Sequence, residues 1–141
     1  MTRHSQGIVS PRAPEPVGPY PHARKIGNLL FLSGVGPRQR GSTEIPGVTR
    51  NAAGTIIAHD IEAQARAVFA NVRMILEDAG AAWEDIVDVT VFLTNMAEDF
   101  AAFNRVYTEY FAGIAPCRTT VEVNALPTPI AIELKVIAAL P

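Results

Sequence analysis

The sequence predicts one α+β domain, in which two helices cover a single face of a β-sheet. The length supports this prediction, because 141 residues with 48% hydrophobic content form one domain with a sizeable core. Apolar residues recur at helical spacing in two segments, and β-branched residues are dense in several others. Two helices can cover only one face of such a sheet, so its other face must meet water or another subunit.

The N-terminal part of the chain contains a proline-rich arm, a strand and a long loop. Residues 1–17 are expected to form an extended, irregular arm, because proline fixes φ and removes a hydrogen-bond donor, and residues 18–141 are expected to form the single domain. Residues 24–34 predict a first strand, since an apolar run there ends at a turn-prone Ser-Gly pair. Residues 37–54 are rich in turn-forming residues and predict a loop, whose unusual length suggests a function. A short second strand follows over residues 55–58.

Two helices and three strands complete the chain in the order ββαβαββ. Asp60 is a good N-cap for a helix that ends before Gly80. Residues 86–93 predict a buried strand, because they are dense in β-branched residues. A second helix is predicted over residues 99–111, with aromatic residues along one side. The last two strands are predicted over residues 118–123 and residues 130–139.

The composition argues against several classes of function and location. Lys and Arg number 12 and Asp and Glu number 14, so the formal net charge of −2 disfavours binding to nucleic acid. The single cysteine, Cys117, cannot form an internal disulfide, which favours the cytoplasm. No apolar run approaches the roughly 20 residues that cross a bilayer, so no membrane association is expected. The three histidines are too widely spaced to predict a metal site.

The polar positions of the last two strands are the best candidates for chemistry. Side chains two residues apart share a face, which groups Arg118 with Thr120 and, in the last strand, Glu133 with Lys135. We interpret both groups as the polar side of the sheet. Glu133, within an apolar strand, either faces solvent, pairs with a cation or transfers protons. Arg118 either clamps a substrate carboxylate or forms an ordinary surface ion pair. Cys117 is expected to be a small buried thiol rather than a nucleophile.

Six segments between about residues 18 and 138 follow one another in a recognisable order. They are GPYPHAR, NLLFLSG, AQARAVFANVRMILEDAG, DIVDVTVFLTNM, FAAFNRVYTEYF and PCRTTVEVNALPTPIAIELKVIA. Together they resemble the RidA (YjgF) family of enamine/imine deaminases, and the last segment is the most specific.

The resemblance implies a chorismate-mutase-like α+β fold and a homotrimer. In that assembly the sheets line a central barrel and the ligand sites lie between neighbouring subunits. It also implies hydrolysis of a small anionic enamine or imine without a metal or organic cofactor. The matched positions imply that Arg118 binds the substrate carboxylate and that Glu133 activates water. The residues implied to line the pocket are Tyr20, Ser33, Gly34, Asn104 and Thr120, of which Thr120 stands where many relatives have cysteine.

Within the family, PHAR, the long segment 37–54 and RTTVEV resemble the 2-aminomuconate deaminase branch, which acts in the degradation of aromatic compounds. That substrate has two carboxylates, so a second cationic group is expected at the distal end of the pocket. The possible suppliers are His22, Arg24, Arg38, Arg40 and Arg50. The alternatives are a broad 2-iminobutanoate/2-iminopropanoate deaminase and a non-catalytic, ligand-binding or chaperone-like trimer. The net charge disfavours the ribonuclease activity that has been proposed in the family.

Overall fold

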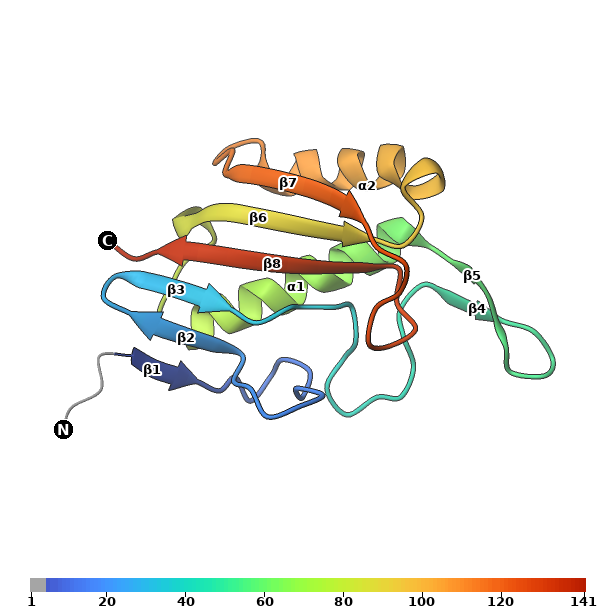
Figure 1. The fold of residues 1–141 in the computed structure, drawn as a ribbon, viewed down its shortest axis with the longest axis horizontal. Coiled ribbons are helices and arrows are strands. Elements are labelled where there is room, and N and C mark those ends of the chain that lie inside the picture. The colour runs from blue at the N-terminus through green and yellow to red at the C-terminus, as the bar shows by residue number, and fades with distance from the viewer. Residues whose placement is uncertain (1–4) are drawn as a thin grey trace.

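The computed structural model describes residues 5–141 and shows a mixed six-stranded sheet with both helices against one face (Figure 1). The strands lie side by side in the order β1 (Ser5–Ile8), β2 (Ala23–Ile26), β3 (Leu29–Leu32), β8 (Ile132–Ala139), β6 (Ile86–Leu93) and β7 (Cys117–Glu122). Neighbouring strands are antiparallel except β6 and β7, which run parallel because helix α2 (Met96–Phe111) connects them. The predicted α+β class is therefore confirmed.

The segment predicted as a single strand over residues 24–34 is instead the hairpin of β2 and β3. The chain reverses at Gly27, whose φ of +58° suits a residue without a Cβ, followed by Asn28. This two-residue turn interrupts the apolar run so briefly that the pattern resembles one strand. The arm predicted to be irregular contributes β1, an edge strand that pairs with β2, while residues 1–4 of that arm lie outside the described residues.

The segment predicted as a loop over residues 37–54 also contains a strand. β4 (Val48–Arg50) pairs with β5 (Ile56–His59) in a separate two-stranded sheet, which projects from the body of the molecule in Figure 1. The helix α2 begins three residues earlier than predicted, because the side chain of Asn95 caps it by accepting a hydrogen bond from the Glu98 N–H at 3.2 Å.

The helix α1 (Ile61–Asp78) lies behind the sheet and supplies much of the core (Figure 1). Its predicted N-cap is confirmed, since the Asp60 carboxylate accepts a hydrogen bond from the Ala63 N–H at 3.2 Å. Phe69 is 1% exposed and packs edge-on against Trp83, which lies in a short 3₁₀ helix (Trp83–Asp85). It also packs edge-on against aromatic residues of α2. Neither helix in residues 5–141 has the length and apolarity needed to span a bilayer.

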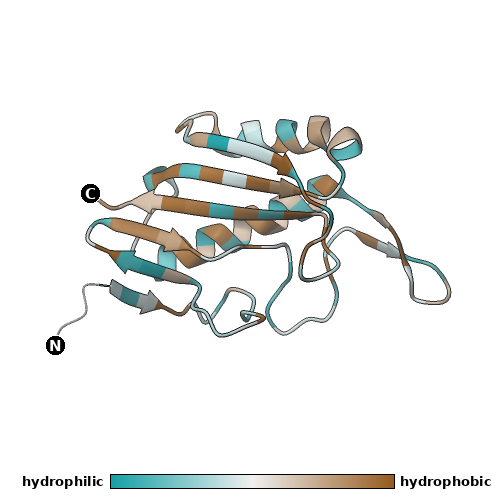
Figure 2. Ribbon diagram, in the orientation of Figure 1, coloured by the Kyte–Doolittle hydropathy of each residue, from teal (hydrophilic) through white to brown (hydrophobic). Residues whose placement is uncertain are grey.

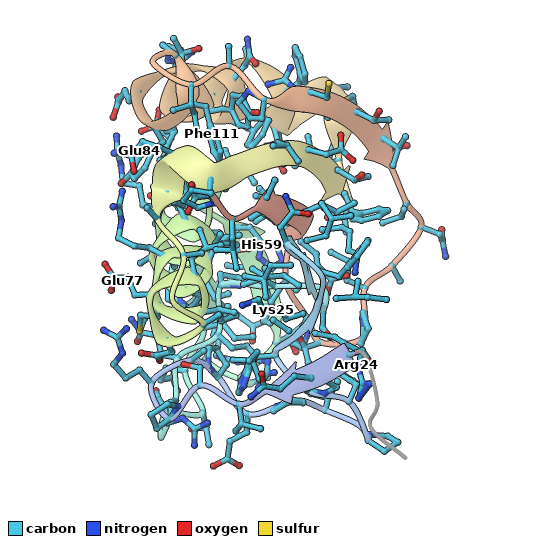
Figure 3. All side chains as sticks on the ribbon, turned by 90° about the vertical axis from the view of Figure 1, so that its left-hand side faces the viewer. Arg24, Lys25, His59, Glu77, Glu84 and Phe111 are labelled. Carbon is cyan, nitrogen blue, oxygen red and sulfur yellow. The ribbon has the colours of Figure 1, made fainter. Side chains whose placement is uncertain are left out.

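The sheet face turned away from the helices is open in the single chain. Figure 3 shows the two sides, with Glu77 of α1 on one side and Arg24 of β2 on the other. Hydrophobic residues run along β3, β6 and β8 (Figure 2). Three apolar cross-strand pairs occupy the open face, namely Ile26 with Leu29, Phe31 with Ile137 and Phe92 with Val121. Such a face is suited to burial against another protein surface.

Candidate active site

Glu133 lies near the start of β8 on the open face, where its carboxylate packs against Gly34. A Cβ at position 34 would lie 2.8 Å from Glu133 Oε2 and 2.9 Å from Cδ, so only glycine permits this contact. The adjacent Ile132 and Leu134 are fully buried on the opposite face and hold the strand in place. Burial raises the pKa of Glu133, because desolvation disfavours the charged carboxylate. A half-buried carboxyl group of this kind is suited to proton exchange with a ligand.

A gap between β3 and β8 gives the Glu133 carboxylate its space. The two strands pair as far as Phe31, and pairing resumes only beyond Gly34. Ser33, inside the gap, donates its N–H to the His22 carbonyl at 3.0 Å and its hydroxyl to the Pro21 carbonyl at 2.7 Å. Among residues 5–141, no backbone carbonyl accepts the Gly34 N–H. This N–H is therefore available to a ligand beside the glutamate.

A small cavity of about 40 Å³ joins Glu133 to Tyr20 and Gly34, and Arg38 also lines it. An adjoining cavity of the same size shares Tyr20, Gly34 and Arg38 and is lined in addition by Ser33. The structure thus brings together four of the seven residues that the sequence assigned to the site. Each cavity has room for only a few water molecules, so a ligand would need space that opens outward.

The other three assigned residues lie between β7 and α2. Arg118 donates from Nη1 to Asn104 Oδ1 at 2.8 Å, and its Cζ lies 4.5 Å from the centre of the Tyr107 ring. Stacking on the ring and the amide contact fix the guanidinium while leaving other N–H groups free for a carboxylate. The Thr120 hydroxyl is buried without a hydrogen-bond partner in the described part of the chain. Sequence reasoning treated Tyr107 only as one of the aromatic residues along the second helix, although its position one turn after Asn104 on α2 was a usable signal.

Arg118 and Glu133 do not share a face, so the interpretation of one polar side is wrong. Glu133 lies beside Phe92, and Phe92 lies beside Val121, which places all three on the open face. Arg118 is three residues before Val121, and an odd separation directs its side chain to the other face. Cys117, predicted to be buried, is exposed at the edge of the sheet.

A larger hollow of about 340 Å³ lies elsewhere, beside β5 and the start of α2. His59, Asn95 and Asp99 line it together with other residues, but none of the seven assigned residues does. Within residues 5–141, no three His, Cys, Asp or Glu side chains are arranged to hold a metal ion.

Comparisons with known proteins agree with this architecture. The family model described as Endoribonuclease L-PSP matches residues 10–140. A RutC family protein of Pyrococcus abyssi is 41% identical over 131 residues, which cover 93% of this chain and 94% of that protein. A protein of Dermatophagoides farinae named 2-iminobutanoate/2-iminopropanoate deaminase is 34% identical and covers 94% of both chains.

Solved structures have the same fold over nearly the whole chain. The crystal structure of E. coli TdcF with bound serine has a TM-score of 0.82 and 33% identity, and it covers 96% of this chain and 99% of that one. The E. coli YjgF gene product has a TM-score of 0.80 and 34% identity, with 95% and 98% covered. Matches of this extent in both sequence and fold show that the chain belongs to the endoribonuclease L-PSP family, the RidA/YjgF family that its motifs resemble.

Proposed function

We propose that the protein deaminates a small enamine or imine carboxylate by hydrolysis, at sites shared between neighbouring subunits of a homotrimer. The observation that carries this proposal is that Glu133 and Arg118 of the same chain lie on opposite faces of the sheet. On the open face, a single chain therefore presents the carboxyl group of Glu133 for proton exchange but no arginine to bind the substrate carboxylate. A neighbouring copy packed against the open apolar face would supply the clamp, in a closed ring where every subunit contributes both halves.

The proposed roles follow from the two local environments. Arg118 of one subunit holds the substrate carboxylate through its free N–H groups, and the Gly34 N–H of its neighbour assists. Protonation of the enamine at carbon, with loss of a proton from its nitrogen, gives the imine. Glu133 then takes a proton from water as the water oxygen bonds to the imine carbon, and gives it to the imine nitrogen, which leaves a carbinolamine. It next takes the hydroxyl proton of the carbinolamine and gives it to the nitrogen as the C=O bond forms and the C–N bond breaks. The products are a ketone and ammonia, so no oxidant, reductant or cofactor enters the balance.

We propose 2-aminomuconate as the substrate, converted to 2-oxohex-3-enedioate (4-oxalocrotonate) and ammonia. The resemblance of PHAR, RTTVEV and the long segment 37–54 to that branch supports it. The names of similar proteins favour a second candidate, a broad 2-iminobutanoate/2-iminopropanoate deaminase. Ammonia release from 2-aminomuconate and from freshly generated 2-iminobutanoate, compared by kcat/KM, separates the two. Ligand binding without turnover of either would favour a non-catalytic binding trimer instead.

Mixed trimers test whether one site draws on two subunits. We would co-express Arg118→Ala and Glu133→Gln chains with different tags and purify the species that carries both tags. Each variant alone should be inactive. If the site spans two subunits, every mixed trimer regains one intact site, which gives roughly one third of wild-type activity. Mixed trimers as inactive as the single variants would show that both residues act from the same chain and would refute the shared site.

A further inference from the structure

We propose that Arg38 binds a second anionic group of the ligand and thereby selects dicarboxylates over monocarboxylates. This inference rests on the proposed function for the reaction, but its test measures binding and needs no turnover. It identifies one cation among the five that the sequence offered.

Arg38 is in the right place because it lines both small cavities of the site. It shares them with Tyr20 and Gly34, and Glu133 lines one of the two. The backbone at this point is fixed although it lies in an irregular segment. Asn71 of α1 is 3% exposed, and its Nδ2 donates to the carbonyls of Gly36 at 2.9 Å and of Arg38 at 2.7 Å. The guanidinium therefore extends from an anchored position rather than from a free loop.

The guanidinium of Arg38 has N–H donors that no group in the described residues accepts. Its one hydrogen bond in residues 5–141 runs from Nη2 to the Glu15 carbonyl oxygen at 2.9 Å, and it forms no ion pair with any described carboxylate. Burial raises the pKa of the Glu133 carboxyl, and no ion pair joins Glu133 to Arg38 in the described residues. The two charged groups thus share a cavity without neutralising each other. A half-buried arginine without a counter-charge favours entry of an anion, which its planar fork can bind at two points.

The other four cations either use their donors within the fold or do not line the cavities of the site. Both ring nitrogens of His22 bond to backbone groups of the N-terminal segment, at 2.9 and 2.7 Å. Arg40 donates to two backbone carbonyls of that segment and pairs with Glu15. Arg24 bonds to a serine of β1, and Arg50 bonds to a carbonyl within the β4–β5 hairpin. Among the five, only Arg38 has a guanidinium group with unused N–H donors at the cavity that Glu133 lines.

This arrangement gives the ligand a direction. With its reacting carbon beside Glu133, a dicarboxylate would place one carboxylate at Arg118 of the neighbouring subunit and the other at Arg38. A monocarboxylate would use Arg118 alone. Discrimination between the two ligand classes then depends on Arg38 and not on the catalytic pair.

Muconate and sorbate make a matched pair of probes, because both are six-carbon dienes and sorbate has a methyl group where muconate has its second carboxylate. Isothermal titration of the wild-type protein should show muconate binding about 10- to 100-fold more tightly, the range expected for one charge-assisted contact. Arg38→Gln should reduce this preference to less than about threefold and leave sorbate binding unchanged. Arg38→Lys keeps the charge but loses the fork, so an intermediate preference is expected.

Arg40→Gln is the matched control, since Arg40 anchors the same N-terminal segment but does not line the cavity with Glu133. It should keep the preference for muconate. The inference is overturned if wild-type protein binds the two probes equally or not at all, or if Arg38→Gln or Arg38→Lys weakens both equally. Absence of ammonia release from any imine would count against the proposed reaction and would leave this binding result standing.

Discussion

Replacement of Gly34 by alanine probes how closely the Glu133 carboxylate must be positioned. The new Cβ would lie 2.8 Å from Oε2, whereas ordinary van der Waals contact begins at 3.4 Å, so the carboxylate must retreat by about 0.6 Å. The strand itself cannot move far, because Ile132 and Leu134 are fully buried. Since a 1 Å misplacement of a catalytic group costs about 100-fold, this retreat should lower kcat/KM by about 10- to 20-fold.

The same substitution should spare the fold, which separates positioning from instability. Gly34 is exposed and does not have a positive φ, so alanine costs no backbone strain, and the melting temperature should stay within a few degrees of wild type. Gly113→Ala is the control, because nothing lies within 4 Å of a Cβ at that position. Steady-state ammonia release and thermal melts of the three proteins measure both effects. Wild-type kcat/KM in a folded Gly34→Ala protein would refute the reasoning.

Two further predictions depend on pH. Because burial raises the pKa of Glu133 and the base must be deprotonated, kcat/KM should fall on the acid side with a midpoint above 4.5, the ordinary glutamate value. A midpoint at or below that value in the kcat/KM profile would contradict this role. Arg12 and Ser10 donate hydrogen bonds to Asp78 and hold the pKa of its carboxyl below the usual range. Their contribution to the free energy of unfolding is therefore present above the pKa that Asp78 has in the unfolded chain, and it is lost as the pH falls through the lower pKa of the folded protein. Asp78→Asn should therefore lower the melting temperature at pH 7, and calorimetry should show the difference from wild type narrowing below pH 3.8; a constant difference would exclude the ion pair as its cause.

The sequence located a helix or strand well where the periodic pattern of apolar residues extends over many residues, or where turn and cap residues mark both ends of the segment. The strand over residues 86–93 matches β6, because a segment dense in β-branched residues there follows a short 3₁₀ helix and precedes a helix cap. The hairpin of β2 and β3 was missed because its turn is only two residues long. The strand β4 was missed because three residues are too few to show alternation, and its partner β5 lies beyond a further turn.

The candidate site illustrates a different limit, which comes from strand register. Alternation within β7 and β8 correctly showed that Arg118 shares a face with Thr120 and Glu133 with Lys135. Which of those faces coincide depends on how both strands align with β6, and that alignment is set by contacts distant in sequence. A shift by one residue would exchange every side chain between faces. Local pattern therefore identifies candidate groups but not whether one chain can bring them together.

Irregular segments impose a further limit, and Arg38 is the clearest case. A loop has no period from which to infer a direction, so five cations were equivalent candidates before their hydrogen bonds were known. What distinguishes Arg38 is that it lines the cavity with Glu133, that its backbone is held by Asn71 and that its guanidinium forms only one bond. An arginine with a fixed backbone and unused N–H donors is suited to bind a ligand. Arg40, two residues later, instead donates hydrogen bonds to the N-terminal segment of the chain. Assigning specificity to a cation in such a segment thus requires an account of every donor it has, which only the folded chain provides.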